Sequence, residues 1–365
     1  MRNIGLYIHI PFCRGKCPYC DFFSVNWDRN AVEKYTQALC RKIESLKGRY
    51  NAETVYFGGG TPSSIGTQNM IKILNSINSS FGKSCVECTL EVNPESAKEQ
   101  DFKLLKEAGV NRISMGLQSA NENELKALGR KHSAEDVVKA VSMIKSSGIS
   151  NISLDLMLGI SEQTEESLER SILFCQELDI SHISAYMLKI EPGTPYSRQK
   201  NSLSLPDEDT VCDLYEYTVQ RLKKSGFAQY EISNFSKPGL ESRHNLKYWN
   251  CEEYLGLGPG AHSFINKNRF YYERNFDSFF ADITVNDGKG GSEDEYITMR
   301  LRLSDGISKT EFKRYFGYDI PQKYIDKAAK LEKLGYTVCT QNGFSLSVKG
   351  FLISNTIITE ILTAK

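Results

Sequence analysis

The sequence lacks the features that place a protein in a membrane or on nucleic acid. No stretch approaches the roughly 18 consecutive apolar residues that a membrane-spanning helix needs. The N-terminal apolar run is interrupted by His9 and Pro11 and no small-residue cleavage site follows, so we expect no signal peptide. An excess of one charge sign is also missing, since 45 basic residues balance 45 acidic ones. We therefore expect a cytoplasmic protein without an electrostatic surface for nucleic acid or anionic membranes.

The chain also shows no second cysteine pair at a spacing from the first cysteines that suits a structural zinc site. Three of its ten cysteines, Cys13, Cys17 and Cys20, share the segment IHIPFCRGKCPYCDFF with the spacing C-x₃-C-x₂-C. In a reducing compartment, clustered cysteines indicate metal binding or catalysis more often than disulfides. Two sites fit the spacing: a zinc site completed by a remote ligand such as His9, or an iron–sulfur cube whose open iron binds a substrate or cofactor.

Most of the other seven cysteines lie within apolar helical or strand patterns, where an inert buried thiol is the usual role. Cys85 and Cys88 have the C-x-x-C spacing of a redox pair. Such a pair usually begins a helix, whereas this one enters the strand-like run VECTLEVN. We therefore interpret Cys85 and Cys88 as structural.

Strand-like and helix-like segments alternate from Ile4 to about Ile190. A weak repeat begins at Gly109, Gly148 and Asp179, and each copy follows a helical pattern. The spacing suits βα units of about 30 residues. Six units fit, which predicts an α/β fold with six parallel strands, either a partial (β/α)6 barrel or a doubly wound sheet.

The 365 residues exceed the size at which one hydrophobic core usually stops growing. We divide them into a barrel at 1–190, an extension at 191–290 and a C-terminal domain at 291–365. The segment NDGKGGSED resembles a linker. The tail predicts three helices, a hairpin around Asn342 and Gly343, and a last helix, an order typical of winged-helix-like α+β domains. Such a fold does not by itself assign a function.

The cysteine spacing, with an aromatic residue directly before the last cysteine, resembles the radical S-adenosylmethionine (SAM) superfamily. The resemblance implies a [4Fe-4S] cluster on Cys13, Cys17 and Cys20, with one open iron that chelates the amino and carboxylate groups of SAM. It also implies a partial barrel. The residues that it assigns to the SAM site are Tyr7, Tyr19, Gly60, Thr61, Glu91, Gln118, Arg130, Asp155 and Lys189.

Several of these residues also have ordinary structural interpretations. The loop FGGGTPS around Gly60 fits many glycine-rich turns, although it is no Walker loop because no Lys-Ser/Thr follows. Glu91 and Asp155 lie in strand-like runs, where a carboxylate needs a partner. That partner is either a salt-bridging side chain or the ammonium or ribose of SAM. The Arg130 fork suits a carboxylate, but a lone arginine is most often solvated.

Further segments narrow the resemblance to the oxygen-independent coproporphyrinogen III oxidase group, from about residue 4 to the C-terminus. These segments are YIHIPFC, GGGTPS, LEVNP, GLQS, ISAYMLKIEPGTP and LGLGPGAHSF. The oxidase branch has an N-terminal extension and a further cysteine two places after the last cluster ligand. Here that place is Phe22, and the cluster loop begins too early to leave room for the extension. The haem-chaperone branch, of the HemW type, carries H-N-x-x-Y-W, which RHNLKYW matches.

The second branch implies a protein that binds haem and transfers it to haem-requiring apoproteins, with a reductant such as flavodoxin or ferredoxin. A homodimer is among the assemblies that this resemblance allows. One alternative is the coproporphyrinogen III oxidase, which performs a radical oxidative decarboxylation. Another is a radical SAM enzyme of unknown substrate. Whether the chain is an enzyme therefore stays open.

His244 lies in this segment. A lone histidine more often forms hydrogen bonds than binds a metal, but haem iron accepts an axial histidine. With the resemblance, we predict His244 as a haem ligand, with Tyr248 or Trp249 against the porphyrin and Arg243 or Lys247 at its propionates. The unperturbed histidine pKa then predicts that haem binding weakens below about pH 6.5.

Overall fold

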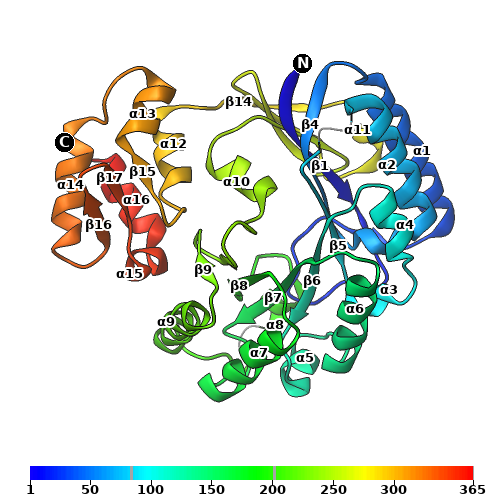
Figure 1. Cartoon of the computed structure of the whole chain (residues 1–365), viewed down its shortest axis with the longest axis horizontal. Helices are drawn as coiled ribbons and strands as arrows, with labels where there is room; N and C mark the ends of the chain where they lie inside the picture. Colours follow the sequence, from blue (N-terminus) through cyan, green and yellow to red (C-terminus); the bar gives the residue numbers. More distant parts are fainter. Residues whose placement is uncertain (83–84, 200–202, 365) are drawn as a thin grey trace.

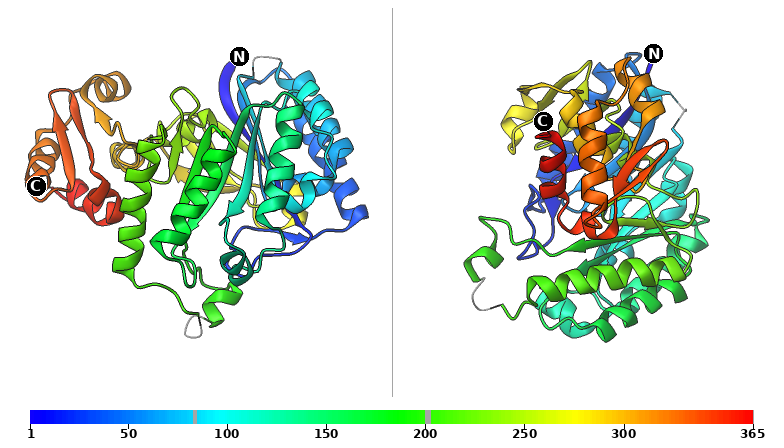
Figure 2. Two further views of the ribbon diagram at one scale, coloured as in Figure 1. Left: turned by 60° about the horizontal axis from the view of Figure 1, so that its bottom comes forward. Right: turned by 90° about the vertical axis from the view of Figure 1, so that its left-hand side faces the viewer.

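The structure is a computed structural model that describes residues 1–82, 85–199 and 203–364. Its main feature is a curved sheet of twelve strands in the order β14-β13-β12-β11-β1-β4-β5-β6-β7-β8-β10-β9. A separate three-stranded sheet lies in the C-terminal part, to one side of the large sheet (Figures 1 and 2). Within the described ranges, no helix combines the length and the apolar character that crossing a membrane requires.

Six neighbouring strands of the large sheet run parallel and follow one another in chain order. They are β1 (Arg2–Ile10), β4 (Tyr50–Gly59), β5 (Glu87–Val92), β6 (Arg112–Gln118), β7 (Asn151–Leu158) and β8 (His182–Met187). The two outer strands of this set pair with further strands and not with each other, so the barrel is open. The predicted partial (β/α)6 barrel is therefore confirmed.

Helices between these strands cover the outer face of the sheet (Figure 1). The longer ones are α1 (Arg29–Ser45), α2 (Thr67–Phe81), α6 (Ala134–Ser146) and α7 (Glu165–Glu177), and the shorter ones are η1 (Pro62–Ile65), α3 (Pro94–Ala97), α4 (Phe102–Glu107) and α5 (Glu122–Ala127). Helix α1 begins where the Asp28 carboxylate accepts the Ala31 amide. Its buried face carries Tyr35, Leu39 and Ile43 at helical spacing, so burial of these side chains attaches it to the sheet.

The sheet continues beyond the six strands at both edges. On one side β11 (Tyr254–Leu257) is parallel to β1, and β12 (His262–Ile265), β13 (Asn268–Tyr271) and β14 (Val285–Lys289) follow antiparallel. On the other side lie β10 (Asn234–Ser236) and β9 (Ala228–Gln229). The remaining elements before the tail are β2 (Phe12–Cys13), β3 (Val25–Asn26), α8 (Pro195–Gln199), α9 (Glu208–Lys224), α10 (Arg243–Trp249) and α11 (Phe276–Phe280).

The interpretation of NDGKGGSED as a linker is wrong for its first residues, because β14 includes Asn286 to Lys289 and pairs with β13. This edge strand is mostly exposed. It needs no alternating apolar residues, and its composition therefore resembles that of a loop. The divisions at residues 190 and 290 stay predictions.

The tail comprises α12 (Glu293–Arg300), β15 (Ile307–Ser308), α13 (Lys309–Phe316), α14 (Gln322–Glu332), β16 (Thr337–Thr340), β17 (Gly343–Leu346), α15 (Val348–Leu352) and α16 (Ser354–Leu362). The three predicted helices and the hairpin are present, but the short strand β15 follows the first helix, and two helices instead of one follow the hairpin. The strands form the antiparallel order β15-β17-β16, with the predicted hairpin between the last two. This winged-helix-like unit has its own aromatic core, in which Phe312 is fully buried against Tyr296, Phe316 and Tyr318.

We expect Phe312→Ala to lower the free energy of unfolding by about 3–5 kcal/mol, because it removes a buried ring and leaves a cavity. Chemical denaturation followed by circular dichroism measures this loss. Tyr318→Ala is the matched control, since its ring contacts the same core but is 48% exposed. Equal losses in the two variants would contradict the assignment of Phe312 as the centre of this core.

Candidate cofactor site at the open end of the barrel

The three clustered cysteines lie on a loop at the carboxyl end of β1. The base of this loop is closed by the pairing of β2 with β3 and by the Trp27 amide, which donates to the Cys13 carbonyl at 2.9 Å. A turn within it joins the Cys20 amide to the Cys17 carbonyl at 3.1 Å. All three thiols are free and partly exposed. The loop therefore presents them at the end of the barrel where parallel α/β proteins place their chemistry.

The loop after β4 packs directly against the cysteine loop. The Gly60 amide donates to the Ile10 carbonyl at 2.9 Å, and the Thr61 amide donates to the Phe12 carbonyl at 2.8 Å. A Cβ atom on Gly60 would lie 2.8 Å from the Phe12 carbonyl oxygen, so only glycine fits. The Thr61 hydroxyl lies 3.5 Å from the Cys13 sulfur. The structure thus brings Gly60 and Thr61 beside the first cysteine.

Tyr7 and His9 point from β1 into the same region. The Tyr7 hydroxyl lies 3.1 Å from Nδ1 of His9, and Nε2 of His9 lies 2.9 Å from the Phe23 carbonyl oxygen. Burial lowers the pKa of His9 to about 4. Both ring nitrogens have partners, so His9 has no free nitrogen to complete the alternative zinc site.

Arg130 lies beside the second cysteine. One terminal nitrogen donates to the Cys17 sulfur at 3.3 Å, and the other donates to the Gly116 carbonyl at 2.8 Å and to Asn93 Oδ1 at 3.4 Å. Its Nε is buried and has no partner among the described residues. The side chain is therefore held among strand ends and is not a solvated surface residue.

Glu91 on β5 and Asp155 on β7 face the interior of the barrel. The Tyr56 hydroxyl donates to Glu91 at 2.8 Å, and the Ser114 hydroxyl donates to Asp155 at 3.4 Å. Burial raises the pKa of Glu91 to about 7 and that of Asp155 to about 6. Each of these carboxyls therefore accepts a hydrogen bond from a hydroxyl group. The salt bridge that the sequence offered as one alternative is not formed among the described residues.

The other expected residues are less closely grouped. Gln118 ends β6 with a positive φ of 69°, at a register shift in its pairing with β7. Tyr19 packs against the small apolar cluster of Leu128, Met157 and Ile160, and its burial raises the pKa of its hydroxyl. Lys189 is largely exposed, and its ammonium group forms an ion pair with Glu191 at 2.6 Å.

The residues present suit a cluster better than a single ion. Across the described ranges, no three His, Cys, Asp or Glu side chains converge closely enough to hold one metal ion. The thiolates of an iron–sulfur cube bind different irons and need no common point. Polar groups are also available to a further ligand. They are the unpartnered Nε of Arg130 and the carboxyl groups of Glu91 and Asp155, whose pKa values are raised.

Asn93 and Tyr56 are site residues that the sequence did not reveal. Asn93 Nδ2 donates to the Thr61 hydroxyl at 3.1 Å, and its carbonyl oxygen accepts from Arg130, so it joins the two. Tyr56 holds Glu91, and its ring is stacked on His244 at a centroid distance of 5.3 Å. The sequence indicates a site role for these two residues only through their position, because each lies near the end of a strand-like segment.

His244 lies on α10 beneath this site and is fully buried. Its Nδ1 is 2.8 Å from the Thr54 hydroxyl and its Nε2 is 2.8 Å from the Tyr248 hydroxyl. Burial lowers the pKa of His244 to about 3. Lys247 forms ion pairs with Glu53 and Glu252 at 2.6 and 2.8 Å, so its charge is already neutralised.

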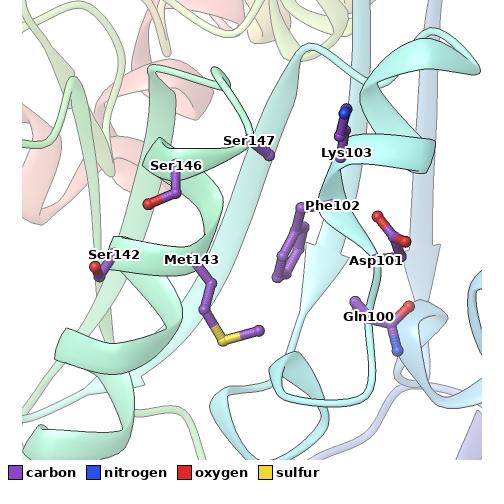
Figure 3. Close-up of a pocket in the computed structure, with 8 residues that line it drawn as sticks. All are labelled: Gln100, Asp101, Phe102, Lys103, Ser142, Met143, Ser146 and Ser147. Carbon is purple, nitrogen blue, oxygen red and sulfur yellow. The ribbon is translucent and has the colours of Figure 1, made fainter.

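Two hollows lie away from the cysteine loop. One, of about 460 Å³, lies on the outer helical layer, where Met143 faces Phe102 and Gln100 (Figure 3). It contains none of the expected site residues. The other, of about 710 Å³, separates α10 from the C-terminal unit and is lined by residues including Leu246, Tyr296 and Arg314.

Comparisons with known proteins agree with this geometry. The family model described as "Radical SAM superfamily" matches residues 7–175. A protein of Bacillus subtilis named heme chaperone HemW is 33% identical over 98% of both chains, and one of Escherichia coli with the same name is 31% identical over 97% of both. The solved structure of the radical SAM enzyme coproporphyrinogen III oxidase (HemN) from Escherichia coli covers 99% of this chain and 90% of its own, with a TM-score of 0.83 and 20% identity.

The structural likeness to the oxidase establishes the fold alone, because the identity is low. The sequence likeness extends over nearly the whole length of both partners. The chain therefore belongs to the radical SAM superfamily and, within it, to the family whose curated members are named heme chaperone HemW.

Proposed function

We propose that the protein is a haem chaperone, which binds haem and transfers it to haem-requiring apoproteins. The observation that carries this proposal is the full-length likeness to proteins named heme chaperone HemW. The oxidase alternative is disfavoured at Phe22, which stands where the oxidase branch has a further cysteine. Its side chain is 67% exposed at the rim of the cysteine loop.

A [4Fe-4S] cluster and SAM are the proposed cofactors. Cys13, Cys17 and Cys20 would hold three irons, and Arg130 would face the carboxylate of SAM. Glu91 and Asp155, which face the barrel interior, would accept hydrogen bonds from its polar groups when ionised. When bound, the cluster and SAM supply one-electron chemistry. Cys13 contacts Thr61 and Cys17 contacts Arg130, and Asn93 holds both of these partners, so the three side chains would orient the ligand.

Haem ligation by His244 requires a local rearrangement. Both ring nitrogens are engaged, so an iron would have to displace either Tyr248 or Thr54. The Tyr248 bond lies within α10 and is the simpler one to open. A cleft of about 710 Å³ lies on the other side of α10, and the ring of Tyr315, which is 39% exposed, lines it. We propose that haem enters at this cleft.

The protein partners follow from the same proposal. A reductant such as flavodoxin or ferredoxin would approach the partly exposed cysteine loop. The acceptors would be haem-requiring apoproteins of the cytoplasm. We also propose that the protein forms a homodimer.

The first test concerns the cluster. Ala variants of Cys13, Cys17 and Cys20, purified without oxygen, should each lose most of their iron and sulfide, because three thiolates leave no spare ligand. Cys40→Ala is the matched control, since Cys40 is also half-buried but lies on α1. Loss of iron in the control but not in the three variants would place the cluster elsewhere.

The second test concerns SAM. Arg130→Ala should weaken SAM binding about 10- to 150-fold, because it removes a charge-assisted contact to the carboxylate. Calorimetric titration of the reconstituted protein measures the dissociation constant. Iron content is measured in parallel, since Arg130 also contacts Cys17. An unchanged affinity at full iron content would refute this role for Arg130.

The third test concerns haem and the oxidase alternative. Anaerobic titration with haem should give a complex with a Soret band. This band should differ between the parent and His244→Ala, while the iron–sulfur content of the two proteins stays the same. Ligation should be nearly independent of pH between 5.5 and 8, because the buried ring, with a pKa of about 3, is already neutral there. This corrects the expectation of a loss below pH 6.5.

His262→Ala serves as the control, since His262 lies on β12 and away from α10. The purified parent protein, incubated with coproporphyrinogen III, a reductant and SAM, should form no protoporphyrinogen IX. Many turnovers of that reaction would overturn the chaperone assignment, and an unaltered spectrum in His244→Ala would place the ligand elsewhere.

A further inference from the structure

The His244 ring is held in one position by its surroundings. The Tyr56 ring stacks on one of its faces, at a centroid distance of 5.3 Å and an interplanar angle of 28°. The Thr54 hydroxyl lies 2.8 Å from Nδ1. A Cβ atom on Gly5 would lie 3.2 Å from Cε1, so the backbone of β1 closes that edge of the ring. The main chain is also fixed, because the buried Glu87 carboxylate accepts the His244 amide at 3.0 Å.

Tyr248 covers the second ring nitrogen. Its hydroxyl lies 2.8 Å from Nε2 of His244, and the two rings meet edge to face at 90°, with centroids 5.2 Å apart. The two residues are one helical turn apart, so their side chains share a face of α10. The Tyr248 side chain is half-buried, whereas His244 is fully buried. The contact at Nε2 is therefore the one that can open while the ring stays in place.

The two hydroxyl groups divide the roles of the ring nitrogens. Burial lowers the pKa of His244 to about 3, so the ring is neutral and has one N–H and one nitrogen lone pair. A phenol is more acidic than an aliphatic alcohol and is the stronger donor. The Tyr248 hydroxyl therefore donates to Nε2, and Nδ1–H donates to the Thr54 hydroxyl. In this tautomer Nε2 can bind iron, and Thr54 is the kind of partner that orients a metal-bound histidine.

We propose that Tyr248 competes with haem iron for Nε2 of His244 and so limits haem affinity to a level that permits release. This inference rests on the proposed haem ligation by His244 and deepens it. Iron and the Tyr248 proton need the same lone pair, so the O–H···N bond breaks when the Fe–N bond forms. The phenol keeps its proton and no electron moves. Return of the hydrogen bond favours dissociation, which matters for a protein that transfers haem because tight binding means slow release.

The test compares anaerobic haem titrations of the parent and Tyr248→Phe. The variant keeps the ring and removes the hydroxyl, so Nε2 loses its hydrogen bond in the haem-free protein. Haem should bind about 2- to 12-fold more tightly, which is the effect of removing one competing hydrogen bond. Tyr248→Leu, which also lacks the hydroxyl, gives the same test if Tyr248→Phe does not fold.

Tyr254→Phe is the matched control. Its ring packs edge to face on that of Tyr248 at 4.6 Å, but its hydroxyl accepts from Arg269 at 3.1 Å. Haem affinity in this variant should equal that of the parent. An equal gain in affinity in Tyr254→Phe would count against the proposal, because it would assign the effect to general packing.

Thr54→Val should have the opposite effect. Without the Thr54 hydroxyl, the ring gains by placing its proton on Nε2 and donating to Tyr248, and that tautomer cannot bind iron through Nε2. Haem should therefore bind more weakly than to the parent. A general loosening of the site would shift both variants in the same direction, whereas the proposal requires opposite shifts.

Release is measured with apomyoglobin as a trap for dissociated haem. The rate should be lower for Tyr248→Phe than for the parent and unchanged for Tyr254→Phe. If the parent binds no haem, or if its Soret band is unaltered in His244→Ala, the proposed ligation fails and this inference fails with it. If the parent binds through His244 but Tyr248→Phe binds no more tightly, the inference alone is overturned.

Discussion

The parallel pairing of β1 with β4 is the constraint on which the candidate site depends. Its register places Tyr7 opposite Tyr56 and Ile10 opposite Gly59. The loops that leave these two strands are therefore adjacent, and the cysteine loop packs on the glycine loop through backbone hydrogen bonds. A shift of one residue would turn every side chain of β1 to the other face of the sheet and separate the two loops.

Tyr56 connects this end of the barrel to α10. Its ring lies between those of Tyr7 and His244, with centroid distances of 6.3 and 5.3 Å, and its hydroxyl donates to Glu91. One buried side chain thus contacts a proposed SAM residue and the proposed haem ligand. Any movement of α10 alters the packing of this ring, which gives the two proposed cofactor sites a physical path of communication.

Burial, more than charge, sets the chemistry of the barrel interior. It lowers the pKa of His9 and His132 to about 4 and that of His244 to about 3. Such histidines are neutral in the folded protein but titrate normally when it unfolds. Each therefore withdraws stability as the pH falls below about 6.5, the unfolded value. Glu91 and Asp155 have raised pKa values and act in the opposite sense, so they partly offset this effect.

The sequence by itself determined the alternation of strands and helices, the position of the cysteine loop after the first strand and the family to which its motifs point. These are local properties, set by hydrophobic periodicity and by spacing along the chain. Only the tertiary structure decided which groups meet. Asn93 joins Thr61 to Arg130, and Glu87 holds α10 across more than 150 residues. Likewise, RHNLKYW contains one hydrogen-bond partner of His244, Tyr248, but it gives no sign of the other, because Thr54 belongs to a distant strand. Burial of the His244 ring depends on the packing of the whole barrel.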